Sequence, residues 1–185
     1  MSLDYSQIKA YVVSVDRTTD TFDAEKLKSA NVIGLFAEAG RLFDVSHTKQ
    51  STYVNPQLDK QIQAAKDASI QYGLFPYVRA RTVKEAEEEL KWLQIYVQKY
   101  VPPLGVWLKL ELSAKSEFND AIIRTYTEKL EKLGLKGKIG LYATRTQLSY
   151  VDWDKWQESL YLWLISHVDD ISDLDQLLDP TFFDL

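Results

Sequence analysis

The segment VWLKLEL, residues 106–112, alternates in the manner of a β-strand. One side of that strand would carry Val106, Leu108, Leu110 and Leu112, and the other side Trp107, Lys109 and Glu111. An exposed edge strand holds a lysine and a glutamate at little cost. A strand that is buried on both faces does not, unless a site uses the two charges. The segment therefore predicts either an edge strand or a strand whose polar side belongs to a functional site.

Similar short apolar segments alternate along the chain with segments of helical periodicity, which is the order of βα units around a parallel sheet. Strands are expected at 10–15, 31–37, 72–78, 106–112, 139–143 and 161–166. Helices are expected from Asp23 to Ser29, from Pro56 to Ser69, after Thr82, and from Ser116 to Leu133. The helix after Thr82 is the clearest, because TVKE (82–85) forms a capping box and Pro102 ends the helix.

Two architectures fit this order of elements: an open doubly wound sheet and a barrel of the (β/α)8 kind. The sequence contains neither GxGxxG nor GxxxxGK[ST], so the nucleotide-binding form of the open sheet lacks its signature. A chain of 185 residues is most simply one domain, and we expect that domain to span 1–185. Both architectures place their sites at the carboxyl ends of the parallel strands.

Four charged residues follow or end expected strands: Asp16, Glu38, Arg79 and Glu111. In a barrel, Glu111 is a candidate general acid, with Asp16 and Glu38 as candidate partners, because most glycosidases work with two carboxylates that flank the scissile bond. The rings of Tyr77, Trp107, Tyr142 and Trp163 could stack on sugars. Each feature also has an ordinary interpretation: helix caps and salt bridges for the carboxylates, core packing for the rings, and an internal Lys109–Glu111 ion pair.

Composition excludes several classes of function. A net charge of −5 and the lack of a basic run argue against nucleic acid as a partner. The chain has no cysteine, and its only histidines are His47 and His167, so we expect no metal and no cofactor. No apolar run approaches the roughly 20 residues of a membrane span, and no signal pattern begins the chain, so its localisation cannot be predicted.

Taken in order, these segments resemble glycoside hydrolase family 25, the lysozymes that cleave bacterial peptidoglycan between N-acetylmuramic acid and N-acetylglucosamine. AYVVS (10–14) stands where the family has G-[IV]-D-V-S, and LFAEAG (35–40) is similar to K-A-[ST]-E-G. TYVNPQLDKQIQAAKDASIQYGLFPYV (52–78) follows the family's Y-x-[DN]-P segment, and PLGVWLKLE (103–111) aligns with P-[IV]-x-[LV]-D-[VL]-E. KLGLKGKIGLYATRTQL (132–148) and YLWLISHV (161–168) resemble its later strands. The resemblance implies an irregular TIM-like (β/α) barrel of the family 25 lysozyme type, shortened at the C-terminus.

The family's functional residues carry over only in part. Glu111 falls on the family's general acid, and Glu38 falls on its second-strand acidic residue. Lys109 falls on the aspartate two residues before the general acid, and Val12 falls on the first-strand aspartate. Pro76 replaces a histidine of the third strand, and the family's late W-Q-Y strand is not recognisable after residue 168. Two of the three expected active-site carboxylates are therefore replaced.

The lysine at 109 opposes the chemistry that the resemblance implies. A general acid must hold a proton near neutral pH, whereas a neighbouring ammonium group favours the ionised form of Glu111. Lysine also replaces a carboxylate that would stabilise developing positive charge, a loss that typically raises a barrier by several kcal/mol. Asp16 lies on the same strand face as Val12 and is the remaining candidate for that role.

These residues predict a lysozyme-like domain that acts on or binds cell-wall peptidoglycan and is impaired as a hydrolase, in a phage or prophage structural or lytic protein. Its partners would be peptidoglycan glycan strands and other phage structural proteins. The substrate-binding residues would be Tyr77, Trp107, Lys109, Arg79, Tyr142 and Trp163. Two alternatives stay open: an active muramidase that uses Glu111 with Asp16 or Glu38, and a non-catalytic barrel that serves in assembly.

Overall fold

The computed structural model describes residues 11–19, 22–41, 53–112 and 114–165. The described strands are β1 (Tyr11–Val15), β2 (Val32–Arg41), β3 (Tyr53–Val54), β4 (Gln71–Val78), β5 (Val106–Leu110), β6 (Ile139–Thr144) and β7 (Tyr161–Ile165). The described helices are α1 (Ala24–Ser29), α2 (Leu58–Asp67), α3 (Val83–Tyr100), α4 (Asn119–Leu130) and α5 (Arg145–Leu148), with a π-helix at Glu131–Leu135 and a 3-10 turn at Trp153–Lys155.

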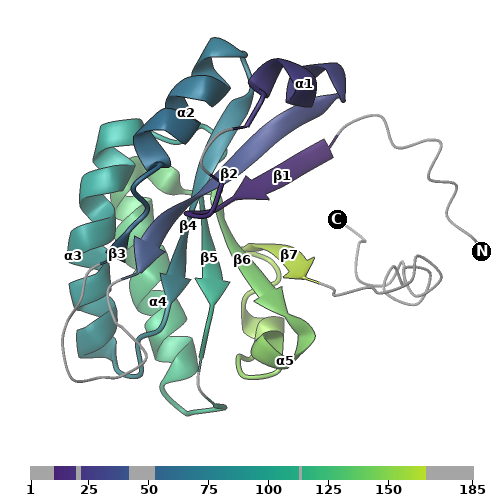
Figure 1. The fold of residues 1–185 in the computed structure, drawn as a ribbon. Helices are drawn as coiled ribbons and strands as arrows, with labels where there is room; N and C mark the ends of the chain where they lie inside the picture. Colours follow the sequence, from purple (N-terminus) through teal and green to yellow (C-terminus); the bar gives the residue numbers. More distant parts are fainter. Residues whose placement is uncertain (1–10, 20–21, 42–52, 113, 166–185) are drawn as a thin grey trace, which may run out of the picture.

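The described strands form one sheet in the order β1-β2-β4-β5-β6-β7, and β3 lies beside β2. Every neighbouring pair along this order is parallel, whereas β3 runs antiparallel to β2. The sheet curls, and α2, α3 and α4 lie along one of its faces (Figure 1). The predicted parallel βα architecture is therefore confirmed, in the form of a TIM-like half-barrel.

The outer face of the sheet packs on the helices and holds the main core. Leu35, Leu74, Leu108 and Leu141 of four successive strands are fully buried, and they belong to one cluster with Ile62 of α2, Leu93 of α3 and Ile123 of α4. The alternation predicted for VWLKLEL is observed in β5. The side chains of Val106, Leu108 and Leu110 are buried in this core, and those of Trp107 and Lys109 are only partly buried. The polar side of β5 therefore faces the concave side of the half-barrel.

A second apolar cluster fills the concave face. It consists of Phe36, Phe75 and Tyr142, with Tyr77, Leu104, Trp107, Trp163 and Ile165 packed against them. Two of these rings lie over a glycine of the adjacent strand: Phe36 over Gly73, and Trp107 over Gly140. A Cβ atom at Gly73 would overlap the Phe36 ring, and one at Gly140 would lie 2.7 Å from the Trp107 ring. Glycine at these positions lets large rings lie flat in the concavity.

The predicted helices are confirmed, with small differences at their ends. Asp23 caps α1, and Thr82 caps α3 by accepting a 3.2 Å hydrogen bond from the backbone N–H of Glu85. The Glu85 carboxylate accepts from the N–H of Arg81, one residue before the position that a capping box uses. Strand β2 continues to Arg41, beyond the predicted end at residue 37. The short elements β3 and α5 were not predicted, since each is too short to show periodicity.

Other expectations fall partly outside the described residues. The strands expected at 10–15 and 161–166 each extend one residue beyond the described part, at residues 10 and 166. Both histidines and the segment after 168, where the family has its W-Q-Y strand, lie outside it entirely. Within the described part of the chain, β1 and β7 each pair along one edge, and the half-barrel is open between them. The concave face between these two strands is therefore available to a ligand or partner as far as the described residues go.

Candidate functional site

The carboxyl ends of β1, β2, β4 and β5 bring the predicted charged residues to one edge of the sheet. Asp16 follows β1 and Arg79 follows β4, as predicted, and Glu111 follows β5, which ends at Leu110 rather than at the predicted residue 112. Glu38 lies within β2 rather than at its end, because β2 is longer than the sequence indicates. This edge is the mouth of the half-barrel, and the arrowheads of β4 and β5 point toward it in Figure 1.

Glu111 forms a salt bridge with Arg79 of the neighbouring strand. The guanidinium Nε lies 2.5 Å from Oε2 of Glu111, and Nη2 contacts the same oxygen. The Arg79 side chain is largely buried, at 14% exposed, and the Glu111 side chain is 35% exposed. Among the described residues Glu111 pairs with Arg79 and not with Lys109, so the predicted Lys109–Glu111 ion pair is wrong. The reason is the register of β4 and β5, in which Val78 lies opposite Leu110, so that Arg79 and Glu111, the next residues, lie side by side.

The backbone around Glu111 is held from two sides. Its N–H donates to the carbonyl of Val78 in a 3.0 Å bond, which continues the β4–β5 pairing by one residue. The Gln147 side chain of α5 then makes two bonds to Leu112, accepting from its N–H at 2.8 Å and donating to its carbonyl at 3.1 Å. Gln147 is a functional neighbour that sequence reasoning missed, since α5 gave no signal of its own. The position of Glu111 is therefore fixed independently of its side-chain partner.

The ammonium group of Lys109 lies close to three aromatic rings on the concave face. Its Nζ donates to the Tyr77 hydroxyl at 3.1 Å and lies 5.4 Å from the Phe75 ring, 4.6 Å from that of Tyr77 and 5.0 Å from that of Tyr142. Cation–π attraction to several rings stabilises an ammonium group without a carboxylate in contact. The mouth of the half-barrel thus holds a stable cation where the resemblance implies an aspartate.

Asp16, directly after β1, and Glu38, within β2, are neighbours, and their environments differ. A hydrogen bond from the Thr18 hydroxyl lowers the pKa of Asp16, and the charge of Lys109 acts in the same direction. Burial raises the pKa of Glu38, against a 3.1 Å hydrogen bond from the backbone N–H of Arg17, and the charge of Asp16 raises it further. The two carboxyl groups are therefore pushed apart in acidity, with Asp16 the stronger acid.

Two buried amides tie these strand ends together. Asn55 Nδ2 donates to the carbonyl of Glu38 at 3.0 Å and to Gln61 Oε1 at 2.9 Å. Gln61 Nε2 donates to the carbonyls of Asp16 at 2.8 Å and of Thr19 at 2.9 Å. Asn55 occupies the [DN] position of the Y-x-[DN]-P pattern, so the sequence pointed to this residue. No sequence pattern pointed to Gln61. Together the amides fix the geometry of Asp16 and Glu38.

The predicted sugar-stacking residues lie together on the concave face, but they are not equally accessible. Trp107 and Trp163 are partly buried, with ring centroids 6.0 Å apart in an edge-to-face arrangement, and Tyr77 is also partly buried. Tyr142 is buried, and its ring centroid lies 4.8 Å from that of Trp163. Tyr142 therefore supports the surface, and the other three rings contribute to it.

Besides Lys109, the structure places the two other residues that differ from those the resemblance implies, Val12 and Pro76. Val12 of β1 is exposed, on the same side as Asp16, as the strand alternation predicts. Pro76 is buried in β4, where its register neighbour on β2 is Gly40. Among residues with described positions, no three His, Cys, Asp or Glu side chains gather into a group that could hold a metal ion. Every helix in the described segments is too short or too polar to cross a membrane.

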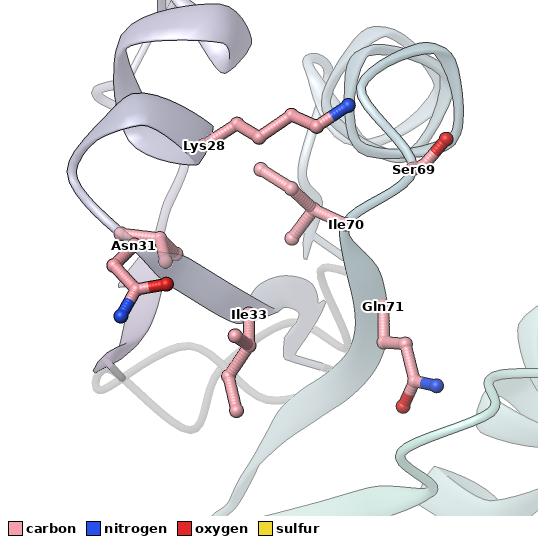
Figure 2. Close-up of a pocket in the computed structure, with 7 residues that line it drawn as sticks. Lys28, Asn31, Ile33, Ser69, Ile70 and Gln71 are labelled. Carbon is pink, nitrogen blue, oxygen red and sulfur yellow. The ribbon is translucent and has the colours of Figure 1, made fainter. Parts of the chain in front are cut away.

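A depression of about 450 Å³ lies at the opposite edge of the sheet. Lys28 extends from α1 toward α2, above Ile33 and Ile70, and Asn31 and Gln71 complete the wall (Figure 2). Apart from Lys28 of α1, the lining residues lie at or just before the amino ends of β2 and β4. Sites of parallel α/β proteins lie at the carboxyl ends of the strands. The depression is thus separate from the mouth that holds Glu111.

No family model and no curated protein matches the chain by sequence. Solved structures match it by fold. The modular autolysin LytC from Streptococcus pneumoniae superposes with a TM-score of 0.69 at 15% identity, over 86% of this chain and 38% of the autolysin, so the chain spans little more than a third of that protein. GHIP, a glycosyl hydrolase 25 of Streptococcus pneumoniae, has a TM-score of 0.68 at 17% identity over 90% of this chain and 72% of its own. The catalytic domain of endolysin ply40 from bacteriophage P40 of Listeria monocytogenes has a TM-score of 0.65 at 18% identity, over 80% of this chain and 70% of its own. The chain therefore has the fold of family 25 lysozymes and endolysins, as the resemblance implied.

Proposed function

We propose that this chain is a lysozyme-like domain that binds the glycan strands of bacterial peptidoglycan and is impaired as a hydrolase. One observation carries the proposal: Glu111, in the general-acid position, is held in a salt bridge by Arg79, and the aspartate position two residues earlier holds Lys109. The guanidinium of Arg79 occupies Oε2 of Glu111 through both Nε and Nη2. The ammonium group of Lys109 stands where a carboxylate would stabilise the positive charge that develops on the sugar, so this environment opposes hydrolysis.

The concave face supports glycan binding. The partly buried rings of Tyr77, Trp107 and Trp163 line it, and flat aromatic surfaces with nearby polar groups suit sugars, which present apolar C–H faces and hydroxyl edges. Among proteins of the same fold, LytC has been solved with a synthetic peptidoglycan ligand, and the Cpl-1 endolysin with a peptidoglycan analogue. The setting that we propose is a phage or prophage lytic or structural protein, because several proteins with this fold are endolysins.

A second candidate is an active muramidase in which Glu111 works with Asp16 or Glu38. The observation that favours it is the neighbouring pair Asp16 and Glu38, in which the pKa of Glu38 is raised by burial and that of Asp16 is lowered by the Thr18 hydroxyl. Two carboxyl groups with acidities pushed apart are the arrangement that acid–base catalysis uses. Glu38 is only 2% exposed, however, which limits its contact with a substrate.

Reducing-sugar release from purified peptidoglycan separates the two candidates. We expect no release above background from the unaltered chain. Release that disappears in a Glu111→Gln variant would establish the muramidase and overturn the impairment. If the unaltered chain is inactive, Lys109→Asp combined with Val12→Asp should create measurable release, provided that the concave face still positions the substrate.

Co-sedimentation with insoluble peptidoglycan tests the binding itself. The unaltered chain should sediment with the glycan, and Trp163→Ala should reduce the bound fraction because it removes a partly exposed ring from the concave face. The matched control is Phe118→Ala, because Phe118 is an exposed aromatic residue that does not belong to the cluster of the concave face. A chain that neither sediments nor gains activity in the double variant would instead be a non-catalytic assembly module.

A further inference from the structure

Four cations line one side of the mouth, and two tyrosine rings lie between them. Arg17 lies 5.0 Å from the Tyr53 ring, and Arg41 lies 5.5 Å from the same ring. Around the Tyr77 ring, Arg41 lies at 5.7 Å, Arg79 at 5.8 Å and Lys109 at 4.6 Å. We call Arg17, Arg41, Arg79 and Lys109 the cationic rim. It runs along the ends of β1, β2, β4 and β5 in a chain whose net charge is −5.

The carboxylates near the rim are already engaged with other groups. Glu111 pairs with Arg79. Asp16 accepts from both the N–H and the hydroxyl of Thr18, at 2.8 and 2.6 Å. Glu38 is buried and accepts from the backbone N–H of Arg17.

The charges of these carboxylates act on the rim from beyond salt-bridge distance. Arg17 and Arg41 influence Glu38, and Lys109 influences Asp16. Within the described residues, the salt bridges of the mouth therefore engage Arg79 and leave the side chains of Arg17, Arg41 and Lys109 without a carboxylate in contact.

We propose that the cationic rim binds an oxyanion, a carboxylate or a phosphodiester, that is carried by a cell-wall glycopolymer, with Arg41 and Lys109 as the residues that contact it. This inference rests on the proposed function, because the sugar units of the same polymer would lie on the aromatic concave face. Arginine presents a planar fork of donors that matches both kinds of oxyanion, and lysine supplies a compact charge. Lys109 donates to Tyr77 through one N–H, so its other donors are not used by that bond.

The arrangement of the rim favours a ligand that has both sugar and charge. Arg41 and Lys109 flank the Tyr77 ring, and Tyr77 belongs to the aromatic cluster of the concave face with Trp107 and Trp163. A polymer that lies on these rings would therefore pass beside the two cations. A neutral glycan would leave them unpaired, so the site discriminates by charge.

Calorimetric titration with four defined ligands tests the inference. The neutral ligand is chitotetraose. The carboxylate ligand is a peptidoglycan glycan chain stripped of its stem peptides, so that the lactyl groups are free. The phosphodiester ligand is a glycerol phosphate oligomer, and dextran sulfate is a polyanion of unrelated backbone. We expect one of the two oxyanion ligands to bind at least about tenfold more tightly than chitotetraose, with an affinity that falls as salt rises.

Variants then identify the residues. Arg41→Gln and Lys109→Gln should each weaken oxyanion binding about tenfold, and Arg41→Gln should leave chitotetraose binding unchanged. Arg124→Gln on the exposed side of α4 makes the same change of charge far from the mouth and should alter neither. Thermal melting of each variant establishes that it is folded. A variant that does not fold is replaced by Arg17→Gln, at an exposed position of the same rim.

The outcomes separate this inference from the proposed function. Equal affinity for chitotetraose and both oxyanion ligands, unaffected by the variants, would overturn the inference and leave glycan binding intact. Binding of the glycerol phosphate oligomer that needs Arg41 and Lys109, without any affinity for chitotetraose or the stripped glycan chain, would support the rim and remove the peptidoglycan assignment. Binding of dextran sulfate as tight as that of the better oxyanion ligand would overturn the inference, because it would mark a nonspecific polyanion surface.

Discussion

Replacing Glu89 by glutamine should remove most of the pH dependence of this domain's stability near neutrality. Glu89 lies in α3 and is 3% exposed. Its carboxylate accepts a hydrogen bond from the Tyr126 hydroxyl of α4 and a 3.3 Å hydrogen bond from the backbone N–H of Arg79. The N–H of Ala80 also donates to it, and Glu85 adds a negative charge one turn earlier. Glu89 therefore joins two helices to the segment that carries Arg79.

Burial raises the pKa of Glu89 from 4.5 to about 7, although the bonds from Tyr126 and the backbone act in the opposite direction. The folded protein thus binds a proton more tightly than the unfolded chain does. The stabilisation is fully present below pH 4.5 and is lost as pH rises through about 7. At about 1.4 kcal/mol for each tenfold change in proton affinity, the loss between these limits is roughly 3 kcal/mol. That is a large share of the roughly 5 to 15 kcal/mol by which folded domains are typically stable.

Glutamine has nearly the shape of protonated glutamate and carries no charge at any pH. Between pH 5 and pH 8, the free energy of unfolding should therefore fall by roughly 2 to 3 kcal/mol less in the Glu89→Gln variant than in the unaltered chain. Urea denaturation followed by circular dichroism at the two pH values measures the difference. Glu87→Gln, at an exposed position of the same helix, is the matched control and should leave the pH dependence unchanged.

Tyr126→Phe supplies an independent test of the same reasoning. It removes the hydroxyl that lowers the pKa of Glu89, so the loss of stability should extend to higher pH than in the unaltered chain. If the unaltered chain and Glu89→Gln lose stability in parallel between pH 5 and pH 8, then Glu89 is already ionised in the folded protein. The account of its burial would then be wrong.

Three further substitutions probe the frame of the mouth. Gly140→Ala should destabilise the domain by about 1 to 3 kcal/mol and shift tryptophan fluorescence, because the alanine Cβ would displace the Trp107 ring. Unchanged emission would contradict this contact. Gln147→Ala should cost about 1 to 3 kcal/mol and speed hydrogen exchange at Leu112, whose N–H loses its acceptor; slow exchange would mean that another group holds it. Arg79→Gln should cost only about 1 kcal/mol in urea denaturation, because the Glu111 side chain is partly exposed, and a loss of several kcal/mol would show that the pair is effectively buried.

The sequence was sufficient to predict the order of elements because hydrophobic periodicity is a local property. The strands β4, β5 and β6 and the helix α3 lie within a few residues of their predicted positions, since each alternates or repeats over its own length. The alternation in β5 also predicted correctly that Trp107 and Lys109 share a face. The closure of the sheet is different, since it depends on contacts between distant segments, and the described residues form an open half-barrel.

The pairing of charges at the mouth could not be predicted in the same way. Lys109 and Glu111 are two residues apart, so a local argument pairs them, but the fold places Arg79 beside Glu111 and three aromatic rings around Lys109. Which cation meets which carboxylate depends on the register between β4 and β5, where Tyr77 lies opposite Lys109. That register is a tertiary property, and no pattern within either strand specifies it.

The frame around Glu111 is built mainly from backbone groups, and this separates the fold from the chemistry. The N–H of Glu111 bonds to the Val78 carbonyl, and Leu112 is held by Gln147 through its own N–H and carbonyl. None of these bonds involves the side chain at 109 or 111. A lysine can therefore occupy position 109 without disturbing the strand, provided that its charge is stabilised. Here the rings of Phe75, Tyr77 and Tyr142 stabilise that charge. Lys109→Asp should therefore change the charge of the mouth without moving Glu111, because the backbone that positions Glu111 keeps its own hydrogen bonds.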